Sequence, residues 1–260
     1  MWWAVNYPAL FLYLGKNFLI MTETVIFTMI YFNKNKIKRW NMGVTKTDFM
    51  RGMQCPKMLW LDKHKPEEKI IPQEVQERLD RGNEFGDKAM GMFGEYVEIS
   101  TYKPNGQWDY AQMIEKTKGC ISLGVNVICE ASFSYYYNFC AVDILKKVEN
   151  GYEMYEVKDS PEVTEQFVKD VGFQRWILEK CGINVVKCCV VYHGEDEENP
   201  FVIKDVTQDA KSYSYEVDDN IWRLGKLKKQ EDEPKISMGE QCNCPYECWY
   251  IDYCRKLNKI

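Results

Sequence analysis

The stretch between residues 125 and 192 constrains the fold more than any other part of the chain. Three runs rich in Val, Ile, Tyr and Phe predict β-strands at 125–132, 135–148 and 152–158. An amphipathic helix is expected at 163–181, with Gly182 as the glycine that ends it. The continuous apolar run 185–192 is typical of a strand buried on both faces. This order predicts a mixed sheet with helices on both faces, an α/β fold of the mixed α+β kind.

Helix and strand signals also flank this stretch. Thr45 or Thr47 can cap a short helix, and Pro56 in a first-turn position starts a second one directly after Cys55. The remaining expected elements are helices at 73–93, 108–118 and 208–229 and short strands at 96–100 and 201–203. No internal repeat is present. We therefore expect one domain over residues 42–260, ending in a cysteine-rich tail at about 236–260.

Composition excludes several classes of protein. The 260 residues are 45% hydrophobic without an excess of Gly or Pro, which excludes collagen-like, low-complexity and disordered chains. Lys and Arg number 34 against 39 Asp and Glu, a net charge of −5, so binding to nucleic acid would need a local basic patch. The 11 cysteines are an odd number and lie mostly in apolar runs. They indicate a reducing compartment, and a cytoplasmic location is expected.

Residues 1–41 differ from the rest and are expected to be an extension outside the core. They are apolar and aromatic with a basic end, but Lys16 and Glu23 interrupt the run. A spanning helix needs about 20 apolar residues, so no membrane association is expected. One interpretation is translated upstream sequence, with Met42 as the native start. A membrane or surface segment and an additional ordered helix are the alternatives. Without these residues the net charge becomes −9.

The predicted hairpin at 135–158 carries the candidate chemistry. Asn150-Gly151 is a strong signal for a two-residue type I′ turn, which would pair Asp143 with Lys158. Glu156 lies two residues from Lys158 and therefore on the same face. Two carboxylates and one ammonium suit a hard divalent cation, Mg²⁺ or Mn²⁺, that activates water beside a phosphate. The alternative is a salt bridge on a solvated face.

The pattern around this hairpin resembles a known nuclease superfamily. Asp143, then Glu156-Val-Lys158, then a helix bearing Gln174 resembles the PD-(D/E)XK nucleases, specifically their RecB-like branch. The resemblance implies a restriction-endonuclease-like mixed sheet. It also implies that Asp143 and Glu156 hold metal, that Lys158 is the catalytic lysine, and that Gln174 positions the site.

The chain departs from this pattern at two places. RecB-like enzymes usually carry a Gly-x-x-x-His motif in an early helix, and here Gly82 is followed by Gly86. Two further residues are candidate carboxylate ligands. They are Glu84 on that helix and Glu130 on the predicted strand 125–132, which precedes the hairpin. RecB-like enzymes often have an aromatic residue four positions after the glutamine, and this chain has Leu178 there.

The tail contains Cys242, Cys248 and Cys254 at even spacing, with Cys244 as an extra thiol. Four thiolates hold either zinc or an iron–sulfur cluster. The tail by itself offers a local zinc site. The resemblance to iron–sulfur nucleases related to the CRISPR-associated RecB-like exonucleases instead implies a 4Fe–4S cluster with Cys55 as the fourth ligand, leaving Cys244 unused.

Two functions follow from the sequence. The first is a metal-dependent DNA nuclease, which the resemblance implies to be an exonuclease acting on single strands or duplex ends. It would work in repair, defence or mobile-element processing, with protein partners in those processes. The second is a catalytically weak nucleic-acid-binding or scaffolding module of the same fold. The acidic balance and the missing histidine favour the second. The complete Asp143, Glu156 and Lys158 set favours the first.

Overall fold

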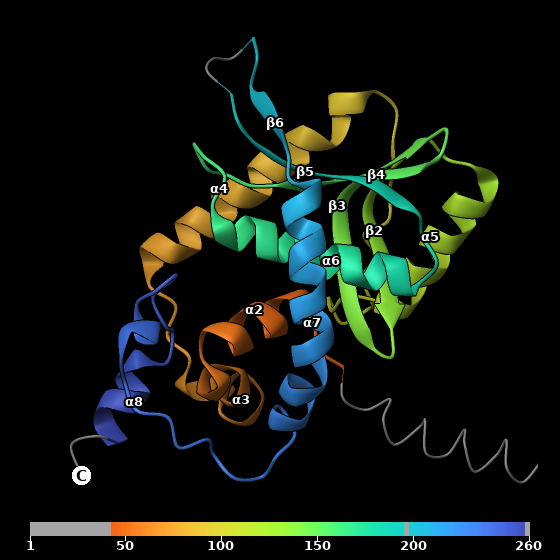
Figure 1. Ribbon diagram of the computed structural model, residues 1–260. Helices are drawn as coiled ribbons and strands as arrows, with labels where there is room; N and C mark the ends of the chain where they lie inside the picture. The colour runs from red at the N-terminus through yellow and green to blue at the C-terminus, as the bar shows by residue number, and fades with distance from the viewer. Residues whose placement is uncertain (1–42, 195–197, 258–260) are drawn as a thin grey trace, which may run out of the picture. The chain divides into compact units, whose positions relative to one another are not determined.

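The computed structural model describes residues 43–194 and 198–257, and its centre is one mixed sheet of six strands. The strands follow one another across the sheet in sequence order (Figure 1). β1 and β2 are parallel, as are β4 and β5, and the other neighbours are antiparallel. The strands are β1 (Val97–Glu98), β2 (Val127–Tyr135), β3 (Asn138–Val148), β4 (Gly151–Val157), β5 (Val185–His193) and β6 (Phe201–Asp205). The predicted mixed sheet is confirmed.

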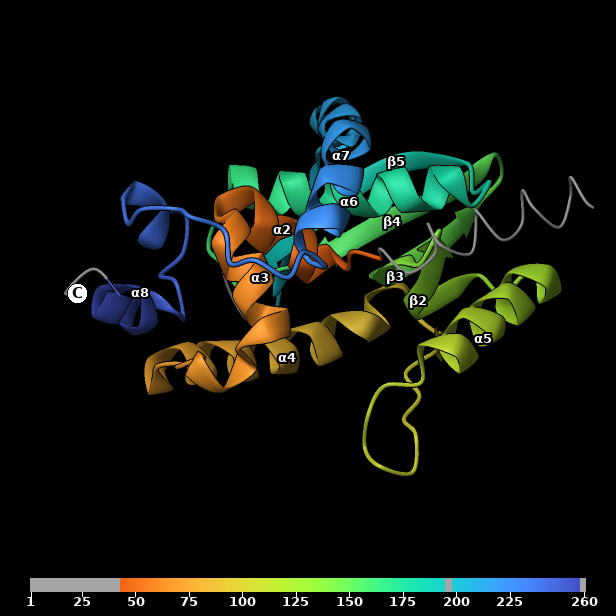
Figure 2. The same ribbon diagram turned by 90° about the horizontal axis from the view of Figure 1, so that it is seen from below.

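Seven α-helices of the described chain flank this sheet. They are α2 (Lys46–Gln54), α3 (Pro56–His64), α4 (Gln73–Met90), α5 (Tyr110–Leu123), α6 (Glu165–Lys180), α7 (Thr207–Leu227) and α8 (Ile251–Leu257). Figure 2 shows α6 and α7 on one side of the sheet and α4 on the other. The helices thus cover both faces, as the sequence predicted.

Each face of the sheet has its own apolar cluster. On the α4 side, Ala89 packs with Cys129, Ile144 and Cys189. On the α6 side, a larger cluster joins the helices to the opposite face of the sheet, and the fully buried Phe173 is one of its members. Burial of apolar surface at about 25 cal/mol per Å² is the main term that holds these layers together.

The start of α2 is determined locally. Thr45 caps the helix by accepting a hydrogen bond from the Asp48 N–H, and the Asp48 carboxylate accepts one from the Thr45 N–H in return. Cys55 then ends α2, and Pro56 begins α3. The two predicted helix starts are confirmed. This short helix consequently carries Lys46 at one end and leads directly into Cys55 at the other.

The register of the β3–β4 hairpin differs from the prediction by two residues. Val148 pairs with Gly151, so Glu149 and Asn150 form the turn, and Ile144 pairs with Tyr155. The predicted register was wrong because β5 determines the turn. Asn184, just before β5, accepts a hydrogen bond from the Tyr152 N–H and donates one to the Asn150 carbonyl. A shift by two residues does not by itself move a side chain to the other face.

The tail packs back on the N-terminal helices. Cys248, Tyr250 and Tyr253 form a separate apolar cluster with Trp60 and Leu61 of α3. The backbone is linked as well, because the Ile70 N–H donates to the carbonyl of Trp249. The end of the described chain and its beginning therefore share one small core.

Residues 1–41, the predicted extension, lie outside the described residues. Among the helices that are described, none has the length and apolar character needed to cross a membrane.

Candidate active site

Glu156 is the centre of a buried cluster of charged side chains on the α6 side of the sheet. Its side chain is 1% exposed. Oε1 accepts hydrogen bonds from Lys158 Nζ at 2.6 Å and from Lys46 Nζ at 2.9 Å, and Oε2 accepts one from the Gln174 amide. Burial opposes ionisation, but the two lysines and Gln174 outweigh it and hold the pKa of Glu156 well below its usual range. Glu156 is therefore an ionised, fully bonded carboxylate.

Lys158 is held in place from two sides. Besides Glu156, its ammonium contacts Asp170 Oδ2 on α6 at 2.7 Å. Burial would lower the pKa of Lys158, but Asp170 and Glu156 raise it above its ordinary value. The lysine thus stays charged at neutral pH. In this environment it can offset negative charge but is a poor general base.

Asp143 and Glu130 bring further negative charge to the same cluster. Asp143 Oδ2 accepts a hydrogen bond from the Val157 N–H at 2.6 Å. Burial first, and then the charges of Glu156 and Glu130, raise the pKa of Asp143 to about 8. Burial also raises the pKa of Glu130 to about 7, with Glu156 adding to the effect. Carboxylates that repel one another in this way gain from a bound cation.

Glu130 occupies an unusual backbone conformation. Its φ angle is +56°, in the left-handed region, which is costly for a residue with a side chain. The ladder pairs Cys129 with Ile144 and Ala131 with Val142, so Glu130 and Asp143 face each other where regular pairing is interrupted. This local break explains why both carboxylates lie near Glu156.

Glu84 lies apart from this cluster. It is exposed on α4, and within residues 43–194 and 198–257 its side chain makes no hydrogen bond or ion pair. Asp87, one turn further along α4, is the acidic residue whose charge helps to raise the pKa of Glu130. Neither histidine replaces the missing motif histidine, because His64 stacks on Trp60 and His193 pairs with Asp159.

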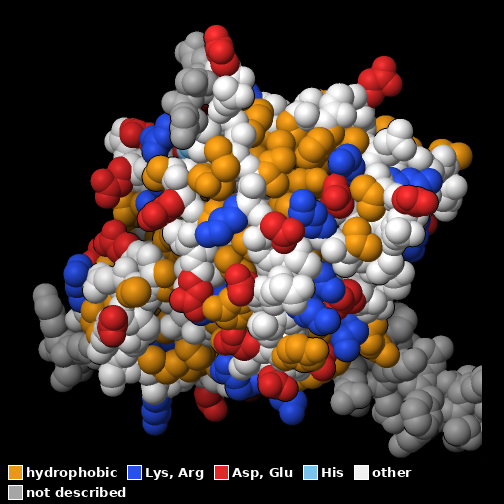
Figure 3. Space-filling view, turned by 45° about the horizontal axis from the view of Figure 1, so that its top comes forward, with side chains coloured by type: hydrophobic (Ala, Val, Ile, Leu, Met, Phe, Trp, Pro, Cys, Tyr) orange, Lys and Arg blue, Asp and Glu red, His pale blue; other side chains and the backbone are white. Residues whose placement is uncertain are grey.

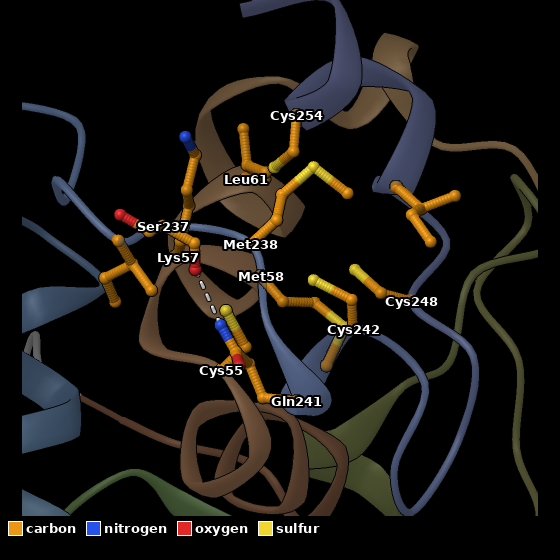
Figure 4. Close-up of a pocket in the computed structure, with 12 residues that line it drawn as sticks. Cys55, Lys57, Met58, Leu61, Ser237, Met238, Gln241, Cys242, Cys248 and Cys254 are labelled. Atoms are coloured by element: carbon orange, nitrogen blue, oxygen red, sulfur yellow. Dashed lines mark hydrogen bonds between the residues drawn. The ribbon is translucent and has the colours of Figure 1, made fainter. Parts of the chain in front are cut away.

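Four of the cysteines line a second site, a small pocket between α3 and the tail (Figure 4). They are Cys55, Cys242, Cys248 and Cys254. Met58, Leu61 and Met238 provide an apolar surround. Burial is the main cause that raises the pKa of the Cys248 thiol to about 11, and the other three cysteines contribute to it. Cys244 is exposed and outside the pocket.

Neither site is a closed metal cage. Over the described ranges, no three or more His, Cys, Asp or Glu side chains are arranged closely enough to hold a metal ion. Binding a cation or a cluster would therefore need side-chain adjustments.

Comparison with known proteins leaves the family unassigned. No family model matches the chain, and no curated protein sequence matches it. Among solved structures, the chain is similar to SSO0001, with 14% identity and a TM-score of 0.31 over 88% of this chain and 96% of that one. It is also similar to an alkaline exonuclease from Laribacter hongkongensis, with 10% identity and a TM-score of 0.27 over 74% of this chain and 96% of that one. Similarity this distant carries no functional argument, so function is argued from the sites.

Two residues of the charged cluster were not predicted from the sequence. Asp170 precedes Gln174 by one helical turn, so the helical period places both on one face and was a usable signal. Lys46 had no such signal, because it lies 110 residues from Glu156. It reaches the cluster because Phe49, one turn along α2, packs on Phe173 of α6 with ring centroids 5.1 Å apart.

The surface drawn in Figure 3 carries no continuous basic area. Lys and Arg side chains alternate there with Asp and Glu side chains. Long-range attraction of nucleic acid by this face is therefore weak.

Proposed function

We propose that the protein is a divalent-metal-dependent nuclease that hydrolyses phosphodiester bonds in DNA, acting from strand ends. The observation that carries the proposal is the crowding of Glu130, Asp143 and Glu156 beside the charged Lys158. Burial first, and then the charges of Glu156 and Glu130, raise the pKa of Asp143 to about 8, and a bound dication would relieve the repulsion among these carboxylates. A plain surface salt bridge, the alternative, would not bury Glu156 to 1% exposure.

The chemistry of the carboxylates in the cluster fits Mg²⁺ or Mn²⁺, although their side chains would have to move closer together to hold one ion. Carboxylate oxygens are the ligands that these hard cations prefer. Within the described residues, Asp143 Oδ1 and the Glu130 carboxylate accept no hydrogen bond. Their lone pairs are thus available to a cation. Asp143 and Glu156 would hold the metal, with Glu130 as an additional oxygen ligand, and Glu156 would give up part of its bonding to the lysines or Gln174 to do so.

Each protein group has a definite part in this chemistry. The bound cation would supply water activation and neutralise charge on the phosphate. Lys158 would offset the negative charge that develops during hydrolysis, and Asp170 keeps its ammonium in position. Gln174 fixes the orientation of the Glu156 carboxylate through Oε2.

For the cysteine pocket we propose a 4Fe–4S cluster held by Cys55, Cys242, Cys248 and Cys254. The support is the composition of the pocket, which joins Cys55 to three tail cysteines and excludes Cys244. A local zinc site within the tail would instead use Cys244. When bound, the cluster would link α3 to the tail and so stabilise the small core formed by the two ends of the described chain.

A binding module without catalysis is the second candidate. Both oxygens of Glu156 already accept hydrogen bonds from protein groups, so the charge network is stable without any metal. The missing motif histidine agrees with this alternative.

The test is a cleavage assay on anaerobically purified protein. End-labelled single-stranded and duplex DNA, with a matched RNA strand, is incubated with Mg²⁺, Mn²⁺ or EDTA. We expect metal-dependent shortening of DNA from its ends. Lys158→Ala should reduce the rate by about 10²–10³-fold, as for other electrostatic stabilisers. DNA affinity should change little, because one lysine among many phosphate contacts contributes a small part of it. Binding without cleavage under both metals would support the module instead.

A further inference from the structure

The charged cluster contains a second lysine that the proposed function does not use. Lys46 Nζ lies 2.9 Å from Glu156 Oε1 and 3.7 Å from Asp170 Oδ2. Lys158 Nζ contacts the same two oxygens at 2.6 and 2.7 Å. Two ammonium groups therefore share one pair of carboxylate oxygens. Like charges this close repel, so the arrangement depends on the surrounding negative charge.

The position of Lys46 has no local explanation. It is the first residue of α2, and the N-terminal end of a helix carries a partial positive charge that disfavours a cation. The helix start is already satisfied by the Thr45 and Asp48 capping box. Lys46 thus adds nothing to the cap, and its side chain is directed to the carboxylates of other elements.

The charges of the cluster balance in a specific way. The cluster contains four carboxylates, Glu130, Asp143, Glu156 and Asp170, and together they would carry −4 once a bound cation keeps all of them ionised. Lys46 and Lys158 reduce this to −2, which is the charge that one divalent cation neutralises. Without Lys46 the cluster would carry −3 and would attract a divalent cation more strongly.

We propose that Lys46 is the second cation of the active site and takes the place of a second metal ion, so that the site binds one divalent cation. This inference rests on the proposed nuclease function. In two-metal nucleases, two ions stabilise the attacking and leaving oxygens. Here Lys46, whose side chain is 26% exposed, would take over the charge stabilisation of the second ion and would contact a phosphate oxygen of the substrate.

The test compares three variants with the unmodified full chain. Lys46→Met removes the charge and keeps most of the length of the side chain, and Lys46→Arg keeps the charge. Lys228→Met is the matched control, because Lys228 pairs with Asp48 in the first turn of α2 at 2.6 Å. Its side chain is 23% exposed, close to the 26% of Lys46, but its contact lies outside the carboxylate cluster.

Two quantities are measured on anaerobically purified protein. Mn²⁺ affinity and stoichiometry are obtained without DNA by electron paramagnetic resonance of the free ion, and cleavage is followed under single-turnover conditions at saturating Mn²⁺. The unmodified chain should bind one Mn²⁺ in the carboxylate cluster. Lys46→Met should cleave about 10²-fold more slowly and yet bind Mn²⁺ about tenfold more tightly, because a nearby positive charge is gone.

The controls separate this role from a structural one. Lys46→Arg should keep the original Mn²⁺ affinity and recover part of the rate, and Lys228→Met should change neither quantity. Two Mn²⁺ ions in the cluster of the unmodified chain would overturn the inference even if Lys46→Met fails to fold. Weaker Mn²⁺ binding by a folded Lys46→Met variant would overturn it as well. If no protein cleaves DNA but Lys46→Met binds Mn²⁺ more tightly, the nuclease proposal fails and the single-cation site stands.

Discussion

At the scale of single residues, the protonation of Asp143 is the most sensitive property of the molecule. Asp143 lies among Glu130, Glu156 and two lysines, with burial as the largest influence on its pKa. Its pKa of about 8 means that the folded chain keeps a proton that the unfolded chain loses above about pH 4. Glu130, at about 7, acts in the same direction. The stability of the fold therefore depends, through both carboxyl groups, on the pH and on the binding of a metal ion.

We predict that the metal-free protein loses stability as the pH rises. The stabilising contribution of protonated Asp143 is complete below about pH 4 and is lost as the pH approaches 8. The Tm should thus fall between about pH 5 and 8, by about 2–4 °C for each kcal/mol lost. Asp143→Asn, which cannot titrate, should flatten this slope. Differential scanning calorimetry in the presence of a chelator measures the dependence of Tm on pH. A Tm that rises between about pH 5 and 8 would contradict the raised pKa of Asp143.

At the scale of elements, α4 and α2 each connect the charged cluster to another part of the structure. α4 packs on the opposite face of the sheet, and the charge of its Asp87 acts on Glu130. α2 places Lys46 beside Glu156 and leads at its other end into Cys55, which lines the cysteine pocket. Substitutions in α4 should therefore change metal binding by the charged cluster, and substitutions at the end of α2 should change the cysteine pocket.

On α4 we predict different effects for two neighbouring carboxylates. Asp87→Asn should weaken Mn²⁺ binding by about two- to fivefold, because it removes negative charge near Glu130. Glu84→Gln, one turn earlier, should leave Mn²⁺ affinity unchanged, and it serves as the control. Titration calorimetry measures both. If Glu84→Gln instead weakened Mn²⁺ binding and Asp87→Asn did not, Glu84 would be a metal ligand.

At the end of α2 we predict that Cys55 is required for the iron–sulfur cluster. Anaerobically purified protein should be brown, with a broad absorbance at the blue end of the visible spectrum. Cys55→Ser should remove this colour as completely as Cys248→Ser, because each takes away one of four ligands. Cys244→Ser should keep it. A colourless protein with one zinc ion that is insensitive to Cys55→Ser would establish the local zinc site.

At the scale of the whole molecule, the first described residues are part of the core. Val44 is fully buried, its N–H donates to the Asn138 side chain at 2.8 Å, and its carbonyl accepts from the Phe139 N–H. This contact attaches the start of α2 to the β2–β3 hairpin. The position of Lys46 thus depends on interactions made by the preceding two residues.

We predict that a chain beginning at Met42 folds with the Tm of the full chain to within about 2 °C. A chain beginning at Thr47 should be less stable by about 2–4 kcal/mol, because it loses the buried Val44, the Thr45 cap and Lys46. Thermal unfolding followed by circular dichroism compares the three proteins. If the chain beginning at Met42 does not fold, residues 1–41 belong to the domain.

Sequence pattern alone was sufficient for the elements and for part of the site. Apolar periodicity located the strands and helices, and Thr45 and Pro56 marked two helix starts, because these signals depend on neighbours within a few residues. Asp143, Glu156 and Lys158 were expected on one face. Glu156 and Lys158 do contact each other, since side chains alternate with a period of two whatever the register, whereas Asp143 reaches them at a break in the β2–β3 ladder that the pattern did not predict.

Only the tertiary structure decided the register itself and the full membership of the site. Asn184 selected the turn from outside the hairpin, and Phe49 packing on Phe173 brought Lys46 to Glu156 across 110 residues of chain. Such contacts leave no local pattern, since their free energy comes from surfaces that meet only after the chain has folded. The sequence by itself therefore determined which carboxylates the hairpin carries, and the packing of α2 and α6 determined which other charged groups meet them.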